Sequence, residues 1–415
     1  MTTHIIDKRE LNTYSETKSV RFLAFSQGFQ SLGGSIFTVS LAVFAGAQQD
    51  ILGLGLVLAA RTLPTVFIAL VGGVVADAVN RKTVAVATLF IVGALNFLLF
   101  WVVGSHGLGV AAQLISVIAG LATAFGTPAL YALLPSIVSK ERNFQANAFV
   151  RTFRNAGALL GPIAVVFIAA RWGALCGLGV SAGCLLIAGL FLLPLRVPAA
   201  PVTKRTSTVS NLKDAVRLGR RHRWLPFMIA FWAVFLAVQA GAFGVTQPVF
   251  ATQEFGPQAW AAMSVALSGG YILTSFVATK LSLNKNLMLI SVVFAALSAI
   301  PNLVMAVSPH VALLCVGAFV SGVGLEISGI AWGSTLQTRV EREHIGKVSS
   351  LDYAVSFGFV PVGYALYGVL GQAVDAHTLL LGTAVILFTL TLIALVVIIS
   401  NRYDTLPTPS SETTA

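Results

Sequence analysis

Long apolar runs alternate with short polar stretches over almost the whole chain. An α-helix needs about 20 mostly apolar residues to cross the hydrocarbon core of a bilayer, and twelve runs reach that length. They form two groups of six: residues 22–46, 52–76, 83–104, 109–132, 145–170 and 173–194, then 225–249, 257–279, 286–308, 310–334, 348–371 and 376–400. The pattern predicts an all-α integral membrane protein with twelve transmembrane helices.

One long polar stretch, residues 195–224, separates the two groups of six. Within it, residues 209–221 carry apolar side chains at helical spacing, which predicts a short surface helix. The chain is therefore divided into an N-terminal tail (1–21), a first six-helix bundle (22–194), a basic linker (195–224), a second six-helix bundle (225–400) and a C-terminal tail (401–415).

Positive residues fix the orientation of this arrangement in the membrane. Of the 26 Lys and Arg residues, 22 lie in the tails, the linker and the even-numbered connections, and Arg171 alone lies on the opposite side. Cytoplasmic segments of membrane proteins carry an excess of Lys and Arg. Both termini and the linker are therefore expected in the cytoplasm, in the plasma (inner) membrane of a bacterium.

Composition agrees with a membrane protein and excludes several other classes. The 415 residues are 56% hydrophobic and 10% charged, whereas soluble domains carry about 25% charged residues. The net charge of +11 follows from the loop asymmetry, so no nucleic-acid partner is expected. The cysteines lie in apolar runs without metal-ligand spacing, and no catalytic constellation or nucleotide-binding loop is present. We expect neither an enzyme nor a resident metal or cofactor.

The loop between the second and third spans carries the most informative motif. Residues 72–82 read GGVVADAVNRK, and Gly73, Asp77, Arg81 and Lys82 match the pattern G-x3-D-[RK]-x-G-[RK]-[RK]. This loop resembles the cytoplasmic motif of the major facilitator superfamily. Asn80 stands where the pattern has its last glycine. Of the residue types other than glycine, asparagine most readily adopts the left-handed turn conformation. The resemblance implies two six-helix bundles around a central cavity, and a gating role for the four matching residues.

Two further segments resemble the exporter branch of that superfamily. Gly157, Gly161 and Pro162 are similar to a glycine-proline element of the fifth span, and residues 337–348 resemble a loop before the eleventh span. Glycines four residues apart also favour close helix packing in membranes, and proline can kink a helix. The antiporter form has further glycines where Ala148 stands here, and the fourth span lacks the arginine that the branch links to proton coupling.

Ionisable residues at bilayer depth are costly and are candidate functional residues. Arg61, Arg154 and Glu326 are the candidates for the substrate cavity, and Glu326, the single deep carboxylate, is the candidate proton carrier. For Arg61 and Arg154 a structural role is an equal alternative, in which each guanidinium group donates to backbone carbonyls freed by a nearby proline. Arg151 is expected to reach the cytoplasmic interface, and Asp352 is interpreted as a helix-end residue.

Five aromatic residues on these and neighbouring helices either line an amphipathic cavity or pack between helices: Trp232, Phe243, Phe250, Tyr271 and Tyr353. An ion pair between Glu326 and an arginine across the cavity would help to close the empty site. Proton competition at Glu326 favours a neutral or cationic amphipathic substrate, whereas an anionic substrate would favour symport.

The leading interpretation is a secondary-active transporter. The exporter-like motifs imply proton-coupled export of a small amphipathic molecule, such as a drug or secondary metabolite, by alternating access. One alternative is a proton-coupled importer of a small, possibly anionic solute. Another, from a different class, is a non-transporting membrane scaffold or receptor. We expect the protein to function as a monomer whose partners are its small-molecule substrate and membrane lipids.

Overall fold

The computed structural model describes residues 8–71, 80–131, 133–138, 143–195, 197, 223–278, 286–308, 310–341 and 344–403. These residues are helical apart from short connections, and they contain no β-strand. Two sequence predictions, the surface helix over 209–221 and the positions of Gly73 and Asp77, lie outside this described part.

The first half contains six long helices and one short one. They are α1 (Lys8–Gln48), α2 (Ile51–Val71), α3 (Arg81–His106), α4 (Val110–Tyr131), α5 (Leu134–Ile137), α6 (Asn143–Trp172) and α7 (Cys176–Leu192). The short connections after α1, α3 and α6 each contain a residue with positive φ: Gln49, Gly107 and Gly173. At Gly107 and Gly173 the chain reverses without the steric cost that a Cβ would bring.

The second half contains more helical pieces because several predicted spans are interrupted. They are α9 (Trp224–Gly241), the π-turn η2 (Ala242–Thr246), α10 (Gln247–Phe255), α11 (Pro257–Ala278), α12 (Leu287–Ala295), the 3₁₀-turn η3 (Ala296–Ala299), α13 (Ile300–Val307), α14 (Val311–Arg339), α15 (Ile345–Ser356), α16 (Val360–Ala373) and α17 (Ala376–Ser400).

A proline follows each of these interruptions. The pieces α10, α13 and α16 have Pro248, Pro301 and Pro361 in their first turn. Proline has no N–H to donate and its ring clashes with the preceding turn, so the backbone just before it changes to a π-turn, a 3₁₀-turn or a short break. Each of these three predicted spans is still one helical segment, made of two α-helical pieces joined by a π-turn, a 3₁₀-turn or a short break.

The predicted membrane-spanning character is confirmed for most of the chain. In the described residues, ten helical segments are long and apolar enough to cross a membrane. Two shorter apolar helices, Ile51–Val66 and Cys176–Leu192, coincide with the predicted second and sixth spans. The protein is thus an all-helical, multi-pass membrane protein.

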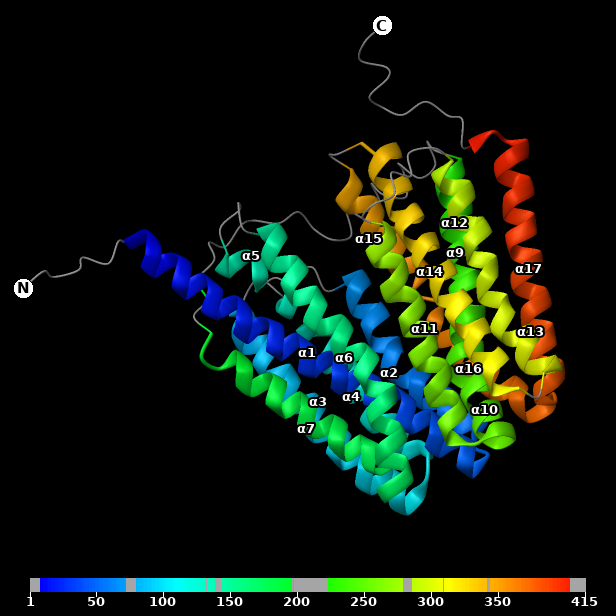
Figure 1. Cartoon of the computed structure of the whole chain (residues 1–415), viewed down its shortest axis with the longest axis horizontal. Helices are drawn as coiled ribbons and strands as arrows, with labels where there is room; N and C mark the ends of the chain where they lie inside the picture. Colours follow the sequence, from blue (N-terminus) through cyan, green and yellow to red (C-terminus); the bar gives the residue numbers. More distant parts are fainter. Residues whose placement is uncertain are drawn as a thin grey trace, which may run out of the picture.

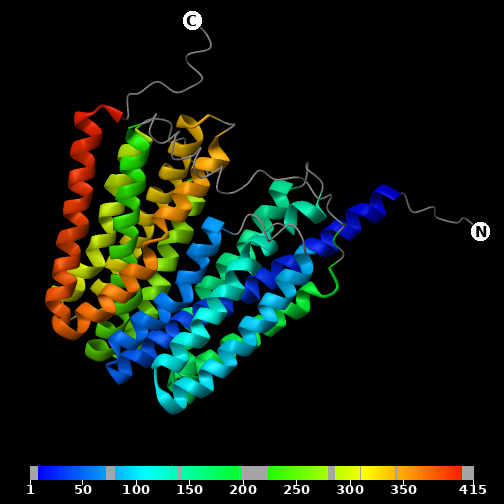
Figure 2. The same ribbon diagram turned by 180° about the vertical axis from the view of Figure 1, so that it is seen from behind.

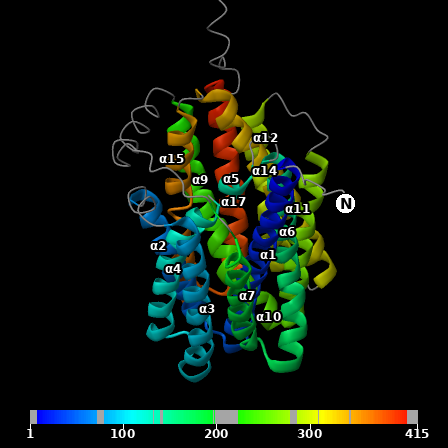
Figure 3. The ribbon, with the colours of Figure 1, turned by 90° about the vertical axis from the view of Figure 1, so that its left-hand side faces the viewer.

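The helices form two bundles that correspond to the two halves of the sequence. In the first half α1 packs against α6 and α7, and α4 packs against α2 and α3; in the second half α14 packs against α11 and α12, and α9 packs against α16. The most extensive contacts between the halves join α2 with α16, α6 with α11, and α1 with α10. Figures 1 and 2 show the bundles from opposite sides, and Figure 3 shows the first half in front.

The two bundles use the same packing device at corresponding helix pairs. In the first half, a Cβ on Gly120 of α4 would collide with the carbonyl oxygen of Arg61 on α2. In the second half, a Cβ on Gly322 of α14 would collide with the carbonyl oxygen of Leu267 on α11. Small residues let membrane helices approach this closely, and their equivalent placement indicates a repeated architecture.

The bundles meet at one end and separate at the other. We call the end with the connections after α1, α3, α6, α10, α13 and α16 the hairpin end, and the end where α1 starts and α17 finishes the terminal end. A single hydrophobic core near the hairpin end joins residues of both halves, including Leu41, Leu54, Val249 and Leu380.

Toward the terminal end this shared core is replaced by two separate ones. The core that contains Leu23 and Leu192 belongs wholly to the first half, and the core that contains Leu225 and Ile398 belongs wholly to the second. The ribbons diverge in the same direction (Figure 1). The structure is therefore a state that is closed at the hairpin end and open at the terminal end.

Candidate functional site

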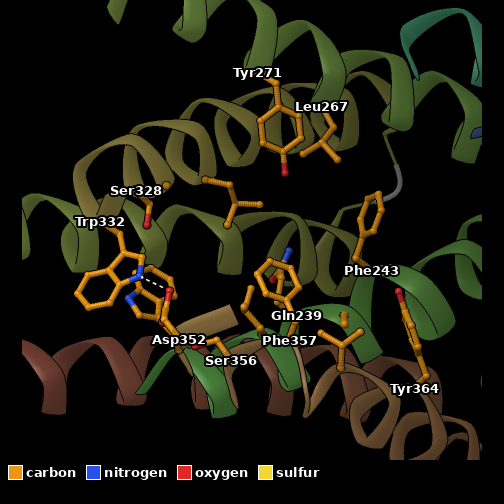
Figure 4. Close-up of a pocket in the computed structure, with 16 residues that line it drawn as sticks. Gln239, Phe243, Leu267, Tyr271, Ser328, Trp332, Asp352, Ser356, Phe357 and Tyr364 are labelled. Carbon is orange, nitrogen blue, oxygen red and sulfur yellow. Dashed lines mark hydrogen bonds between the residues drawn. The ribbon is translucent and has the colours of Figure 1, made fainter. Parts of the chain in front are cut away.

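A cavity of about 560 Å³ lies in the second half, among α9, η2, α11, α14, α15 and α16 (Figure 4). All sixteen of its lining residues come from positions between 232 and 364. Its volume lies within the range of roughly 300–1,000 Å³ that is usual for small-molecule sites. The cavity is thus large enough for a small organic ligand, and one bundle supplies all of its walls.

Aromatic side chains form a large part of the lining. Six of the lining residues carry aromatic rings: Trp232, Phe243, Tyr271, Trp332, Phe357 and Tyr364. Three of the five aromatic residues that the sequence singled out are among them. The other two lie elsewhere, because Phe250 is buried against His377 in the shared core and Tyr353 is an exposed residue that stacks on Phe357.

Asp352 is the charged residue of this cavity. Its Oδ2 accepts a hydrogen bond from the Trp332 indole N–H at 3.1 Å, and its Oδ1 accepts one from the Ser356 hydroxyl at 3.0 Å. No Lys, Arg or His is present among the sixteen lining residues. The interpretation of Asp352 as a helix-end residue is wrong, because α15 begins at Ile345 and Asp352 lies in the second half of that helix.

Glu326 lies beside this cavity and faces a different neighbour. Its carboxylate accepts a hydrogen bond from the Ser275 hydroxyl at 2.5 Å, which joins α14 to α11. Leu325 and Ser328, its neighbours on α14, line the cavity, whereas Glu326 itself does not. The hydrogen-bond partner of this partly buried carboxylate is therefore a neutral hydroxyl.

Arg61 belongs to a polar network that crosses the first bundle. Its Nη1 donates to Asn96 Oδ1 at 3.0 Å, Asn96 Nδ2 donates to Ser181 Oγ at 3.0 Å, and Ser181 Oγ donates to the carbonyl oxygen of Gly33 at 2.7 Å. The guanidinium carbon also lies 4.0 Å from the centroid of the Phe37 ring. The network joins α2, α3, α7 and α1.

Arg154 also has a neutral partner within the first bundle. Its Nη1 donates to the Tyr131 hydroxyl at 3.2 Å, and its guanidinium lies 5.6 Å from the centre of that ring. Arg151, one turn earlier on α6, is exposed. Among the described residues no ion pair joins Glu326 to Arg61 or Arg154, so the structure does not bring these three candidates together in this state.

Comparison with known proteins identifies the family. Residues 23–358 match the Major Facilitator Superfamily, which is most of the chain. The protein belongs to the major facilitator superfamily. No curated protein sequence matches it. Membership of this superfamily indicates a membrane transporter.

Solved structures of other transporters share the fold. The nucleoside transporter NupG superposes with a TM-score of 0.71 at 19% identity, covering 91% of this chain and 98% of that one. A mutant of the peptide transporter POT has a TM-score of 0.69 at 13% identity and covers 93% of this chain and 95% of its own. A bacterial homologue of the human lysosomal transporter Spinster, in an inward-facing and unoccupied conformation, has a TM-score of 0.63 at 13% identity, with 92% and 95% coverage.

The described residues of the superfamily loop motif start the third span. Arg81 and Lys82 are the first residues of α3, and the Asn80 side chain caps this helix by accepting a hydrogen bond from the Lys82 N–H at 3.0 Å. Lys82 Nζ donates to the carbonyl oxygen of Leu193. Asn80 has φ −56°, so the expected left-handed turn is wrong: capping α3 requires an extended backbone before the helix.

The glycines of the fifth-span element face α1. A Cβ on Gly157 would collide with the carbonyl oxygen of Gly28, and one on Gly161 would collide with Ser35. Pro162 follows inside α6, which continues as a helix to Trp172. These residues set how closely α6 approaches α1.

Two polar residues of the cavity, Gln239 and Asp352, were not predicted as site residues from the sequence. Gln239 is a single amide in an apolar run, and its Oε1 is buried without a hydrogen-bond partner beside the cavity. Asp352 and Ser356 are four residues apart and therefore share one face of a helix. That spacing is visible in the sequence and was the available signal for a polar site on α15.

Proposed function

We propose that this protein is a secondary-active exporter that moves a small amphipathic molecule by proton-coupled alternating access. The observation that carries the proposal is the pair of bundles that share one core at the hairpin end and have separate cores at the terminal end. A transporter needs a second state in which this closure is reversed. An aromatic-lined cavity beside the opening supports an amphipathic substrate.

The proposed topology has twelve membrane spans and a cytoplasmic terminal end. The shorter helices α2 and α7 are taken as the two spans that complete the ten longer ones. The concentration of Lys and Arg in terminal-end segments supports this orientation in a plasma membrane. The state described here would then face the cytoplasm, the side from which an exporter loads its substrate.

Proton coupling is assigned to Glu326. Its hydrogen-bond partner, Ser275, is a neutral hydroxyl and not a cation, and ionisable residues at bilayer depth are candidate functional residues. Glu326 also follows Leu325, a lining residue, on α14, so a shift of α14 on protonation would reach the cavity. Arg61 and Arg154 are proposed to contribute to the substrate pathway between the bundles.

Import of an anionic solute is the second candidate. Arg61 and Arg154 contact neutral partners, Asn96 and Tyr131, rather than carboxylates. Such guanidinium groups would suit an anionic substrate, and the proton and that substrate would then favour the same state. Export remains the proposal because the fifth-span and loop motifs resemble those of the exporter branch.

A flux assay with purified protein in liposomes tests coupling and direction. A chemically diverse panel of compounds is offered with the pH gradient in either direction and without one. Glu326→Gln should lose gradient-driven transport but retain substrate exchange, because the amide mimics the protonated carboxyl. Glu254→Gln, the same change at an exposed position of α10, is the matched control and should keep both activities.

Three results would contradict the proposal. Gradient-driven flux that persists in Glu326→Gln would exclude this residue as the proton carrier. Accumulation of a compound on the side toward which protons flow down their gradient would indicate import by symport. The absence of gradient-driven flux for every compound would favour the scaffold or receptor interpretation.

A further inference from the structure

We infer that the second-half cavity is a binding site for an organic cation, with Asp352 as its charged contact. This inference rests on the proposed transport function and names the substrate class for that function. It also separates the substrate charge from the proton carrier, since Asp352 lines the cavity and Glu326 does not.

The charge of Asp352 favours a cationic ligand. The partly buried Asp352 carboxylate is held by two neutral donors, Trp332 and Ser356. Hydrogen bonds orient the charge but do not neutralise it, and a charge removed from water is costly unless it is paired. Because none of the sixteen described lining residues is a Lys, Arg or His, a positively charged ligand would supply a partner for this charge.

The aromatic rings of the cavity also favour a cationic ligand. Cations bind the faces of Trp, Tyr and Phe rings, and this attraction strengthens in sites that exclude water. The cavity presents six such rings, which come from α9, η2, α11, α14, α16 and the connection before α16, and Trp332 lies next to Asp352 (Figure 4). An organic cation satisfies both parts of the cavity, because its charge meets Asp352 and its apolar body meets the rings.

Two polar atoms of lining residues have no hydrogen-bond partner among the described residues. Gln239 Oε1 and Trp232 Nε1 are buried and have no hydrogen-bond partner, and both residues line the cavity. Buried polar groups are nearly always paired in folded proteins. Gln239 Oε1 offers a second acceptor to a ligand, in addition to the carboxylate of Asp352.

An anionic ligand fits this cavity poorly. The two arginines of the membrane-embedded region belong to the first bundle and are absent from the cavity lining. An anion would bring a second negative charge next to Asp352. The geometry therefore separates an anion-compatible first bundle from a cation-selective cavity in the second bundle.

The test uses two probes of equal shape and opposite charge, tetraphenylphosphonium and tetraphenylborate. Equilibrium binding to purified, detergent-solubilised protein is measured for each probe. Tetraphenylphosphonium should bind to the native protein, and Asp352→Asn should weaken this binding at least about tenfold, since a close charge pair is lost. Tetraphenylborate should bind weakly to the native protein and gain affinity in Asp352→Asn.

Asp375→Asn is the matched control for the charge change. Asp375 lies outside the cavity and caps α17 by accepting a hydrogen bond from the Thr378 N–H at 2.9 Å. Hydrogen bonds from the side chain and backbone of Thr378 hold the pKa of Asp375 below its ordinary value. Asparagine also caps helices well, so this variant should fold and bind tetraphenylphosphonium as the native protein does.

A second pair of variants locates the probe without changing Asp352. Gly329 lines the cavity and Gly333 lies one turn further along α14, and a Cβ on either would meet only open space. Gly329→Leu should therefore reduce tetraphenylphosphonium binding at least about tenfold by filling the cavity, whereas Gly333→Leu should not.

Unchanged tetraphenylphosphonium affinity in both Asp352→Asn and Gly329→Leu would overturn the inference. Loss of binding in Glu326→Gln but not in Asp352→Asn would also overturn it, by placing the charge at Glu326. These outcomes differ from failure of the transport proposal. Cation binding that depends on Asp352, without gradient-driven flux, would contradict the proposed proton-coupled transport but support the binding site.

Discussion

Alanine at Gly55 should shift the protein away from the state described here and toward a state that is open at the hairpin end. Gly55 lies on α2 where this helix meets α16 of the other bundle. A Cβ added to Gly55 would lie 2.5 Å from the carbonyl oxygen of Tyr364 and 2.9 Å from the Cα of Gly368. Both are backbone atoms, so no side-chain rotation relieves the clash.

The size of the effect follows from this geometry. The two helices must separate by about 1 Å to restore ordinary van der Waals contact. Overpacking of this kind typically costs about 1–3 kcal/mol. Because the cost falls on the state in which α2 and α16 touch, the ratio of the two states should change roughly 5- to 150-fold.

Accessibility of a cysteine in the cavity measures this shift. Gly329→Cys is introduced after Cys176, Cys184 and Cys315 have been replaced by serine, and a membrane-impermeant maleimide is added from the hairpin side. Gly55→Ala should increase the labelling rate. Gly183→Ala is the control, because a Cβ at Gly183 meets nothing within 4 Å and should leave the rate unchanged.

An unchanged labelling rate in Gly55→Ala, with the variant folded and expressed at the control level, would refute the reasoning. It would mean that the α2–α16 contact persists in both states, or that one state alone exists. A raised rate in both variants would instead indicate general loosening of the bundles.

Three further predictions test other parts of the molecule. A cysteine at Ser207 in the linker should react with an impermeant reagent only after cells are permeabilised, whereas one at Gln253 should react in intact cells; the reverse pattern would invert the topology. Asn96→Ala should lower the free energy of unfolding by about 1–3 kcal/mol, since it removes the hydrogen bonds of Asn96 with Arg61 and Ser181. Asn96→Asp should retain more stability, because a carboxylate still accepts from Arg61. Thermal unfolding in detergent compares the two variants, and equal losses would exclude a stabilising role for the bond to Arg61. Asp77→Asn should slow turnover more than it weakens substrate affinity, and unchanged flux at equal expression would remove the gating role.

The apolar pattern of the sequence by itself determined the architecture. Runs long enough to cross a bilayer have few structural alternatives, because every backbone N–H and C=O must be paired inside the membrane. The division into two halves followed from one polar linker, and the family followed from residues such as Gly73 and Arg81 in a single loop. These features depend on local composition, which a sequence shows directly.

In three apolar runs the α-helix changes to a π-turn, a 3₁₀-turn or a short break just before a proline. Pro248, Pro301 and Pro361 were visible in the sequence, but hydropathy averages over a window and does not register a missing N–H. The average is therefore sensitive to the length of a span and insensitive to its continuity.

Only the tertiary structure decided which polar residues share a site. The depth of Glu326 was readable from its position in an apolar run, but the direction of its side chain toward Ser275 depends on how α14 packs against α11. Asp352 reaches the cavity because α15 begins several residues before it and places it beside Trp332. Such contacts join residues far apart in the sequence, and the rotation of each helix about its axis, which sets them, is fixed by packing between glycine-rich faces.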